Sequence, residues 1–172
     1  WNGLKKGCLL ITKQLKKYFK NDIPISWFVR VDDEIKNEFG SYLGLINKNK
    51  KLFKKFESFN GKFYPHPHLY FFDKKKKTWK QELDEKKNLI QIKNILRSLK
   101  NSKFFKQKII RFGGHYFSNK ILELLIQKRF QIDSTSLPCR TGTPSKPFDW
   151  KNCEKNLHFL KSKKKKGRIL EA

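Results

Sequence analysis

The chain has 172 residues and a formal net charge of +26, with 41 Lys and Arg residues against 15 Asp and Glu residues. Hydrophobic residues make up 37% of the chain and 16 residues are Phe, so it has enough apolar surface for a core and is not a disordered polycation. No stretch approaches the roughly 20 apolar residues of a membrane-spanning helix.

Helical and strand periodicities alternate along the chain. In chain order they predict a helix over 4–20, a strand over 25–31, a helix over 42–58, a strand over 62–69, a helix over 81–100, a strand over 107–112, a helix from about 118 and a strand over 130–136. Ser118 is a candidate N-cap of the last helix. This alternation is typical of βα units around a mostly parallel sheet, either a barrel or a doubly wound sheet. We expect one α/β domain over 1–172 that is loop-rich from about 137.

The positive charge comes almost entirely from lysine, with 35 Lys against 6 Arg spread along the chain. Arg is the side chain that binds phosphates and guanine edges through two parallel hydrogen bonds. Lysines between apolar positions are typical of solvated helix and strand faces, and the run Lys163–Lys166 fits the same interpretation. We therefore expect no specific nucleic-acid partner, although a basic nucleic-acid-binding module stays open as an alternative.

The three cysteines, Cys8, Cys139 and Cys153, have no metal-binding spacing and no even number for disulfides. They favour a reducing compartment, which points to the cytoplasm. The chain begins at Trp1 and not at Met. We therefore expect an internal fragment whose targeting information lies upstream.

Polar clusters follow three of the predicted strands, at the edge where parallel sheets carry their functional loops. The first is Asp32-Asp33-Glu34, directly after the strand over 25–31. Asp32 and Asp33 are candidates for a catalytic base or for metal ligands. Alternatively, these acids begin a helix and complement its dipole.

The second cluster spans 64–70 and contains His66 and His68. Alternate residues of an extended chain point to the same side, and the flanking prolines favour the extended form. Two imidazoles at this spacing supply part of a zinc site, which needs three protein ligands and a water. The alternative is a pair of surface histidines in a proline-rich turn.

The third cluster spans 111–116 and begins with Arg111, followed by two glycines that permit a close backbone approach. Arg111 is suited to orienting a carboxylate base or to binding an anion, and the alternative is an ordinary loop arginine. Further along, Asp149 and Trp150 offer a platform for a sugar ring or a cover over the core. His158 is a lone histidine, for which a structural or solvated role is the default.

Five motifs occur in an order that resembles the polysaccharide deacetylase family, over residues from about 15 to 150. They are Ile-Pro-Ile-Ser-Trp-Phe-Val, Tyr-Pro-His-Pro-His-Leu-Tyr, Arg-Phe-Gly-Gly-His-Tyr-Phe-Ser-Asn-Lys, Asp-Ser-Thr-Ser-Leu-Pro and Phe-Asp-Trp. The resemblance implies an irregular (β/α) barrel of mostly parallel strands, incomplete at both ends. It also implies metal-dependent removal of N-acetyl groups from a polysaccharide or cell-surface glycan. The metal in this family is usually zinc, held by one Asp and two His, and a second Asp is the base.

Carried over to this sequence, the resemblance makes His66 and His68 metal ligands. The family usually places its histidines four residues apart, and position 70 is Tyr here. The resemblance also makes Arg111 the residue that orients the base. The family's Asp-Asp pair ends the first strand, which would lie upstream of Trp1, so Asp32 and Asp33 lie one βα unit later than that pair.

The same resemblance implies a set of substrate-binding residues. They are Tyr70, His115, Tyr116, Asp149 and Trp150. Residues 167–172 resemble the start of a final strand. A catalytically inactive, glycan-binding relative of the same fold is the alternative to an active enzyme.

Overall fold

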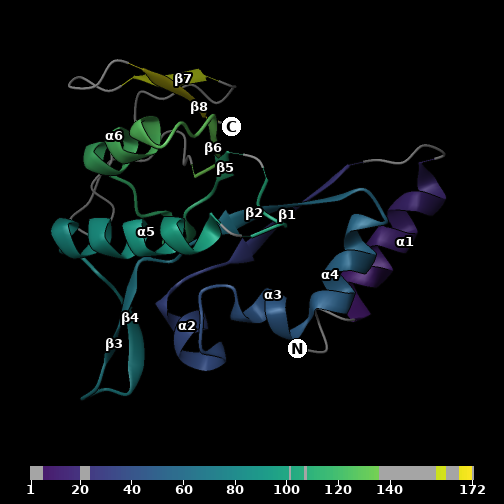
Figure 1. Cartoon of the computed structure of the whole chain (residues 1–172), viewed down its shortest axis with the longest axis horizontal. Coiled ribbons are helices and arrows are strands. Elements are labelled where there is room, and N and C mark those ends of the chain that lie inside the picture. The colour runs from purple at the N-terminus through teal and green to yellow at the C-terminus, as the bar shows by residue number, and fades with distance from the viewer. Residues whose placement is uncertain are drawn as a thin grey trace.

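The computed structural model describes residues 6–19, 24–100, 102–106, 108–135, 158–161 and 167–171 (Figure 1). The chain is an α/β protein. Its helices are α1 (Cys8–Tyr18), α2 (Asp33–Phe39), α3 (Gly44–Lys48), α4 (Lys50–Glu57), α5 (Glu85–Leu99) and α6 (Asn119–Gln127), with the short 3-10 helix η2 (Gly113–His115). Its strands are β1 (Ile25–Arg30), β2 (Gly61–His66), β3 (Tyr70–Asp73), β4 (Thr78–Gln81), β5 (Ile109–Ile110), β6 (Ile132–Asp133), β7 (His158–Lys161) and β8 (Arg168–Glu171).

Two of the predicted helices differ from the structure, one in its interior and one at its start. The helix expected over 42–58 is divided into α3 and α4 at Asn49, whose φ of −116° and ψ of 27° lie outside the helical region. The helix expected over 81–100 begins only at Glu85, because the side chain of Asp84 accepts hydrogen bonds from the backbone N–H groups of Lys86 and Lys87 and so caps α5. The predicted N-cap Ser118 is confirmed, since its side chain accepts from the N–H of Ile121.

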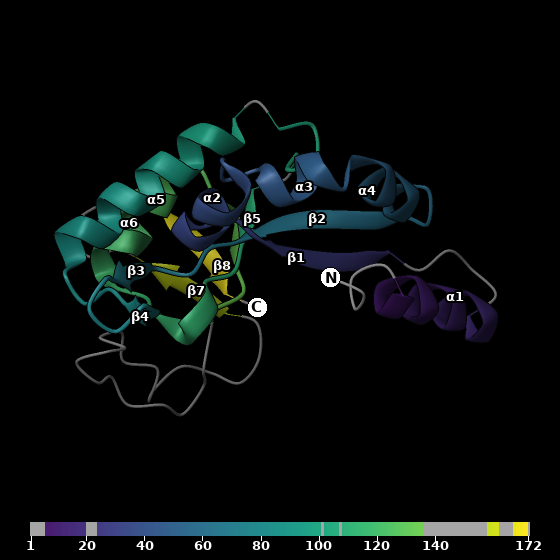
Figure 2. The same ribbon diagram turned by 90° about the horizontal axis from the view of Figure 1, so that it is seen from below.

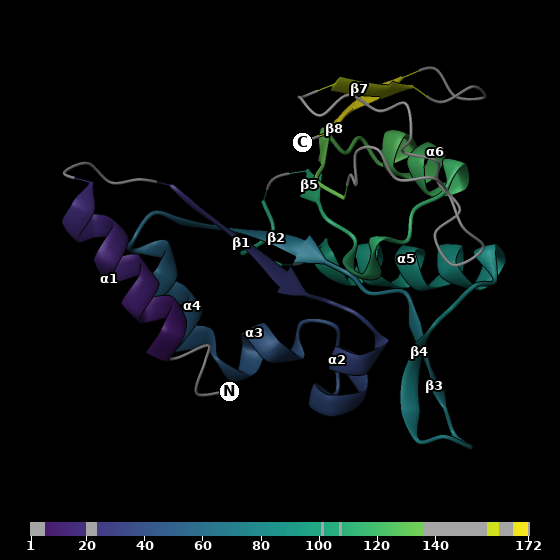
Figure 3. The ribbon, with the colours of Figure 1, turned by 180° about the vertical axis from the view of Figure 1, so that it is seen from behind.

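The sequence did not predict the hairpin that β3 and β4 form. These strands pair antiparallel, from Tyr70 opposite Gln81 to Asp73 opposite Thr78. The Asp73 side chain accepts from the backbone N–H groups of Lys75 and Lys76, which closes the lysine-rich turn between the strands. The hairpin projects away from α5 (Figures 1 and 3).

The parallel strands follow one another in chain order. β1 pairs with β2, β5 pairs with β6, and β6 pairs with β8, all in parallel, while β7 adds an antiparallel edge. Two backbone hydrogen bonds join the sheets, from Arg111 N–H to the Pro65 carbonyl (3.2 Å) and from Gly113 N–H to the Pro67 carbonyl (2.8 Å). The expected final strand is present as β8. Each sheet is small, however, and within the described residues none closes into the expected barrel.

Helices cover one face of these strands. Side chains alternate between the two faces, and those of Val29, Phe63, Ile110 and Ile169 are buried on the covered face. Figure 2 shows α3 and α4 along one side of β1 and β2. On the opposite face Phe28, Ile109, Ile132 and Leu170 are half-buried, and the strand ends carry Arg30, His66 and Arg111 there. The register therefore separates a core face from a face that presents polar groups.

Two apolar clusters form the core. One lies between α2–α4 and the first two strands and contains Phe53, Phe56 and Phe63; the other lies around α5 and α6 and contains Ile92 and Leu125. Burying each such side chain contributes roughly 1.5–3 kcal/mol, so the clusters hold the helices on the sheet. Among the described helices, none combines the length and the apolar character needed to cross a membrane.

Candidate functional site

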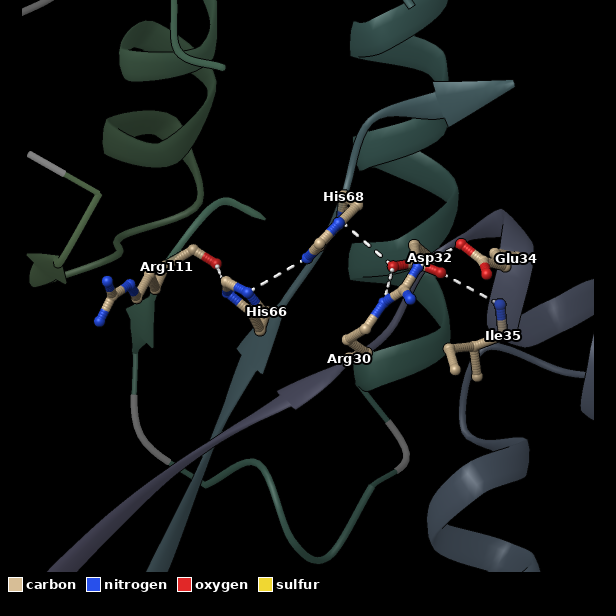
Figure 4. A network of polar contacts seen from close by, with 7 residues as sticks. All are labelled: Arg30, Asp32, Glu34, Ile35, His66, His68 and Arg111. Carbon is tan, nitrogen blue, oxygen red and sulfur yellow. Dashed lines mark hydrogen bonds and ion pairs between the residues drawn. The ribbon is translucent and has the colours of Figure 1, made fainter. Parts of the chain in front are cut away.

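Three chain segments meet at the carboxyl ends of β1, β2 and β5. The first runs from Arg30 to Glu34, the second contains His66 and His68, and the third is Arg111 (Figure 4). Because the strands are parallel neighbours, their ends lie at one edge of the sheet. The structure thus brings together residues from all three clusters that the sequence analysis singled out.

Asp32 connects β1 to the histidine segment. Its Oδ1 accepts from the backbone N–H of Ile35 (3.0 Å) and caps α2. Its Oδ2 accepts from Arg30 Nε (2.9 Å) and from the backbone N–H of His68 (3.3 Å), and the side chain is 1% exposed. Arg30 also bonds Glu34 at 2.7 Å. Asp32 therefore begins a helix, as the alternative for this acidic cluster expected. It also places a fixed negative charge beside His68.

Asp33 is used elsewhere. It is the first residue of α2 and accepts a hydrogen bond from the hydroxyl of Tyr42 (2.7 Å). Burial and then this bond raise the pKa of Tyr42. Of the two predicted acids, only Asp32 has a hydrogen bond to the histidine segment in the described part of the chain.

Pro67 determines how His66 is bonded. In a regular parallel ladder the carbonyl of Arg111 would accept from the N–H of residue 67, and proline has no N–H. His66 Nδ1 takes the place of this missing N–H and lies 2.9 Å from the Arg111 carbonyl oxygen. Since a carbonyl can only accept, Nδ1 carries the proton, and Nε2 of neutral His66 carries a lone pair.

His68 completes the pair. Its Nε2 lies 3.2 Å from Nε2 of His66, and its Nδ1 is buried with no hydrogen-bond partner among the described residues. Burial lowers the pKa of His66, and burial followed by the nearby Arg30 lowers the pKa of His68 to about 4. Both imidazoles are therefore neutral at neutral pH, which is the form that binds metal ions.

The spacing of the two Nε2 atoms fits adjacent ligands of one zinc ion. Zinc–nitrogen bonds of about 2.0–2.1 Å at a tetrahedral angle place two ligand nitrogens roughly 3.3 Å apart, close to the observed 3.2 Å. The proton on His66 Nδ1 and its carbonyl acceptor also match the bonding that metal-ligating histidines have behind the metal. Within the described residues, however, no group of three His, Cys, Asp or Glu side chains has the arrangement of a metal site.

The glycines of the third cluster allow the strands to approach at this edge. A Cβ on Gly113 would overlap the imidazole of His68, so a larger residue here would displace this ring. Gly114 has a φ of 65°, in the left-handed region. Tyr70 packs edge-on against His68, with ring centroids 5.2 Å apart, so it belongs to the site.

The other predicted residues lie differently. The Arg111 guanidinium is stacked over the Phe28 ring at 5.7 Å, and it is the backbone carbonyl of Arg111 that contacts His66. Tyr116 is 1% exposed and is a core residue. His115 contributes backbone to η2, and its side chain lies outside the described part. Asp149 and Trp150 also lie outside the described residues, as do Cys139, Cys153 and the run 163–166.

A polar pair that the sequence pattern did not predict lies behind the site. The backbone N–H of Phe112 donates to Thr135 Oγ1 (2.8 Å), and the Thr135 hydroxyl donates to Asp133 Oδ1. Asp133 is 0% exposed, and burial raises its pKa to about 7. In the sequence, the feature that points to this pair is Asp133, an acid that directly follows apolar Ile132 in a predicted strand.

Comparisons with known proteins add no relative. No family model, no curated protein and no solved structure matches this chain.

A cavity of about 130 Å³ lies at the other end of β2, lined by Gly61, Phe63 and Phe104 among others, away from the histidines. The chemistry of the histidine edge is therefore the basis on which a function is assigned.

Proposed function

We propose that this protein is a metal-dependent hydrolase that removes N-acetyl groups from a polysaccharide or cell-surface glycan. The observation that carries the proposal is the pair of neutral imidazoles, His66 and His68, with Nε2 atoms 3.2 Å apart at the carboxyl edge of parallel strands. His66 and His68 would hold the metal, for which zinc is the best fit. A bound zinc supplies a water with a pKa near neutrality, which is the nucleophile that amide hydrolysis needs.

The strand order supports the matching fold proposal, an irregular and incomplete (β/α) barrel. In such a barrel consecutive parallel strands are neighbours, whereas a doubly wound sheet reverses its order at one point. Here β1, β2, β5, β6 and β8 are neighbours in chain order.

The chain's own residues have distinct proposed roles around the histidines. Asp32 holds the backbone of His68 and places a negative charge beside it. Tyr70 borders the imidazole of His68 on the side of the β3–β4 hairpin. From the resemblance alone, we propose that Asp149 and Trp150 form part of the acetyl pocket.

Zinc binding measured by calorimetry tests the site. The wild-type chain should bind one zinc ion, and the double variant His66→Ala/His68→Ala should not. His158→Ala is the matched control, because His158 lies on β7, which among the described strands pairs with β8 at the edge of its sheet. Equal zinc affinity in the wild type and the double variant would show that the metal site is elsewhere.

A glycan-binding relative without catalysis is the second candidate. It is favoured by the described residues, which contain no three-ligand group. Acetate release from N-acetylated oligosaccharides separates the two functions. Release that depends on zinc and on His66 supports the hydrolase, whereas oligosaccharide binding without release supports the binding protein.

A further inference from the structure

A continuous chain of hydrogen bonds links the buried Asp133 to the two histidines. It runs from Asp133 to the hydroxyl of Thr135 and from this hydroxyl to the N–H of Phe112. The N–H of Phe112 and the carbonyl of Arg111 belong to one peptide group. That carbonyl bonds His66 Nδ1, and His66 Nε2 faces His68 Nε2.

All bonds of this chain point in one direction. Thr135 donates to Asp133, so the lone pairs of its oxygen are free to accept from the peptide N–H. At the other side of the peptide, the carbonyl requires a proton on His66 Nδ1. In the metal-free protein His66 Nε2 then accepts and His68 Nε2 donates, and a metal ion bound to both Nε2 atoms would require the His68 proton on Nδ1 instead. Aligned hydrogen bonds polarise one another, and water screens this effect little because Asp133, Thr135 and Phe112 are each at most 1% exposed.

We propose that Asp133 and Thr135 are positioning residues that hold His66 in its Nδ1-protonated tautomer, with Nε2 directed to the site, through the peptide group between Arg111 and Phe112. The pair lies on the helix-covered face of the sheet and never reaches the site itself. Its influence passes from β6 across β5 to β2, because one peptide group directs its N–H toward Thr135, just after β6, and its carbonyl toward His66 at the end of β2. The expected effect on metal affinity rests on the proposed function, whereas the tautomer of His66 does not depend on that function.

The nearest alternative is that Thr135 and Asp133 only satisfy a buried N–H group. In that case the loss of the Thr135 hydroxyl would lower stability and leave His66 unchanged. Pro67 argues for the positioning role. Because Pro67 has no N–H, the Arg111 carbonyl bonds His66 instead. The orientation of the peptide group between Arg111 and Phe112 therefore decides where the acceptor of the His66 Nδ1 proton lies.

The test combines imidazole nitrogen NMR with zinc titration on the full chain. In the metal-free wild type, His66 should show the chemical shifts of a neutral, Nδ1-protonated ring. Thr135→Val should give a mixture of both tautomers, Asp133→Asn a smaller shift in the same direction, and Thr135→Ser the wild-type spectrum. Thr12→Val is the matched control, because Thr12 is also 1% exposed but donates to the Cys8 carbonyl within α1.

Zinc affinity gives the second measurement. Thr135→Val should weaken binding about 10–100-fold, as expected for loss of a group that orients a metal ligand, while Thr135→Ser and Thr12→Val bind like the wild type. An Nε2-protonated His66 in the wild type, or an unchanged His66 spectrum in Thr135→Val, would overturn the proposal. If even the wild type binds no zinc, the proposed function fails, and the tautomer measurement still decides the role of Thr135.

Discussion

Replacing Asp133 with Asn should flatten the pH dependence of the protein's stability. The Asp133 carboxyl group is fully buried on β6, and its Oδ2 has no hydrogen-bond partner among the described residues. Ile110 from β5 and Glu171 from β8 are its cross-strand neighbours. Burial in these surroundings disfavours the charged form and raises the pKa from 3.8 to about 7.

The sign of the effect follows from proton binding. Between the unfolded pKa near 4 and the folded pKa near 7, the folded protein holds the Asp133 proton and the unfolded chain has released it. The free energy of unfolding therefore falls as pH rises through this window, and the contribution is lost above pH 7. At about 1.4 kcal/mol for each pH unit, the loss is of order 4 kcal/mol. Asn does not titrate, so it removes this slope.

Urea denaturation at a series of pH values between 4 and 8 measures the effect. The difference in unfolding free energy between Asp133→Asn and the wild type should shift in favour of the variant by roughly 3–4 kcal/mol from pH 4 to pH 8. Any constant cost of the Asn amide cancels in this comparison. Glu38→Gln makes the same chemical change at an exposed position of α2 and controls for net charge. Parallel curves for the wild type and Asp133→Asn would refute the reasoning.

Three further predictions concern the site. Gly113→Ala should destabilise the protein by about 1–3 kcal/mol, because its Cβ would overlap His68, whereas Gly7→Ala, with open space around position 7, should not; urea denaturation compares them. The metal-free His68 imidazole should stay neutral until the pH falls to about 4. Its contribution to the free energy of unfolding should therefore decline as the pH falls below 6.5. A His68 titration midpoint near pH 6.5, measured by NMR, would contradict its burial beside Arg30. Asp32→Ala should cost roughly 2–4 kcal/mol, since it removes a helix cap and a buried acceptor of Arg30 and His68, and an unchanged denaturation midpoint would show that these bonds contribute nothing.

Local patterns in the sequence were sufficient for most helices and for the alternation of helices and strands. The N-cap Ser118 followed from residue type and position alone, because a cap is made within a few residues. The lysine-rich hairpin was missed, because residues 70–81 lack the apolar periodicity of a buried strand, and Asp73 closes the turn through contacts of its side chain.

The sequence by itself determined that His66 and His68 project together, because the two-residue period of an extended chain is local. Only the tertiary structure decided which groups meet them. The parallel register brings Arg30 and the Arg111 carbonyl beside His66, and the turn after β1 brings Asp32 to the backbone of His68. The role of Asp133 depends on the same register, since burial between neighbouring strands sets its pKa and one shared peptide connects it to His66. These contacts join residues that lie far apart in the chain, and sequence spacing carries no information about their distance.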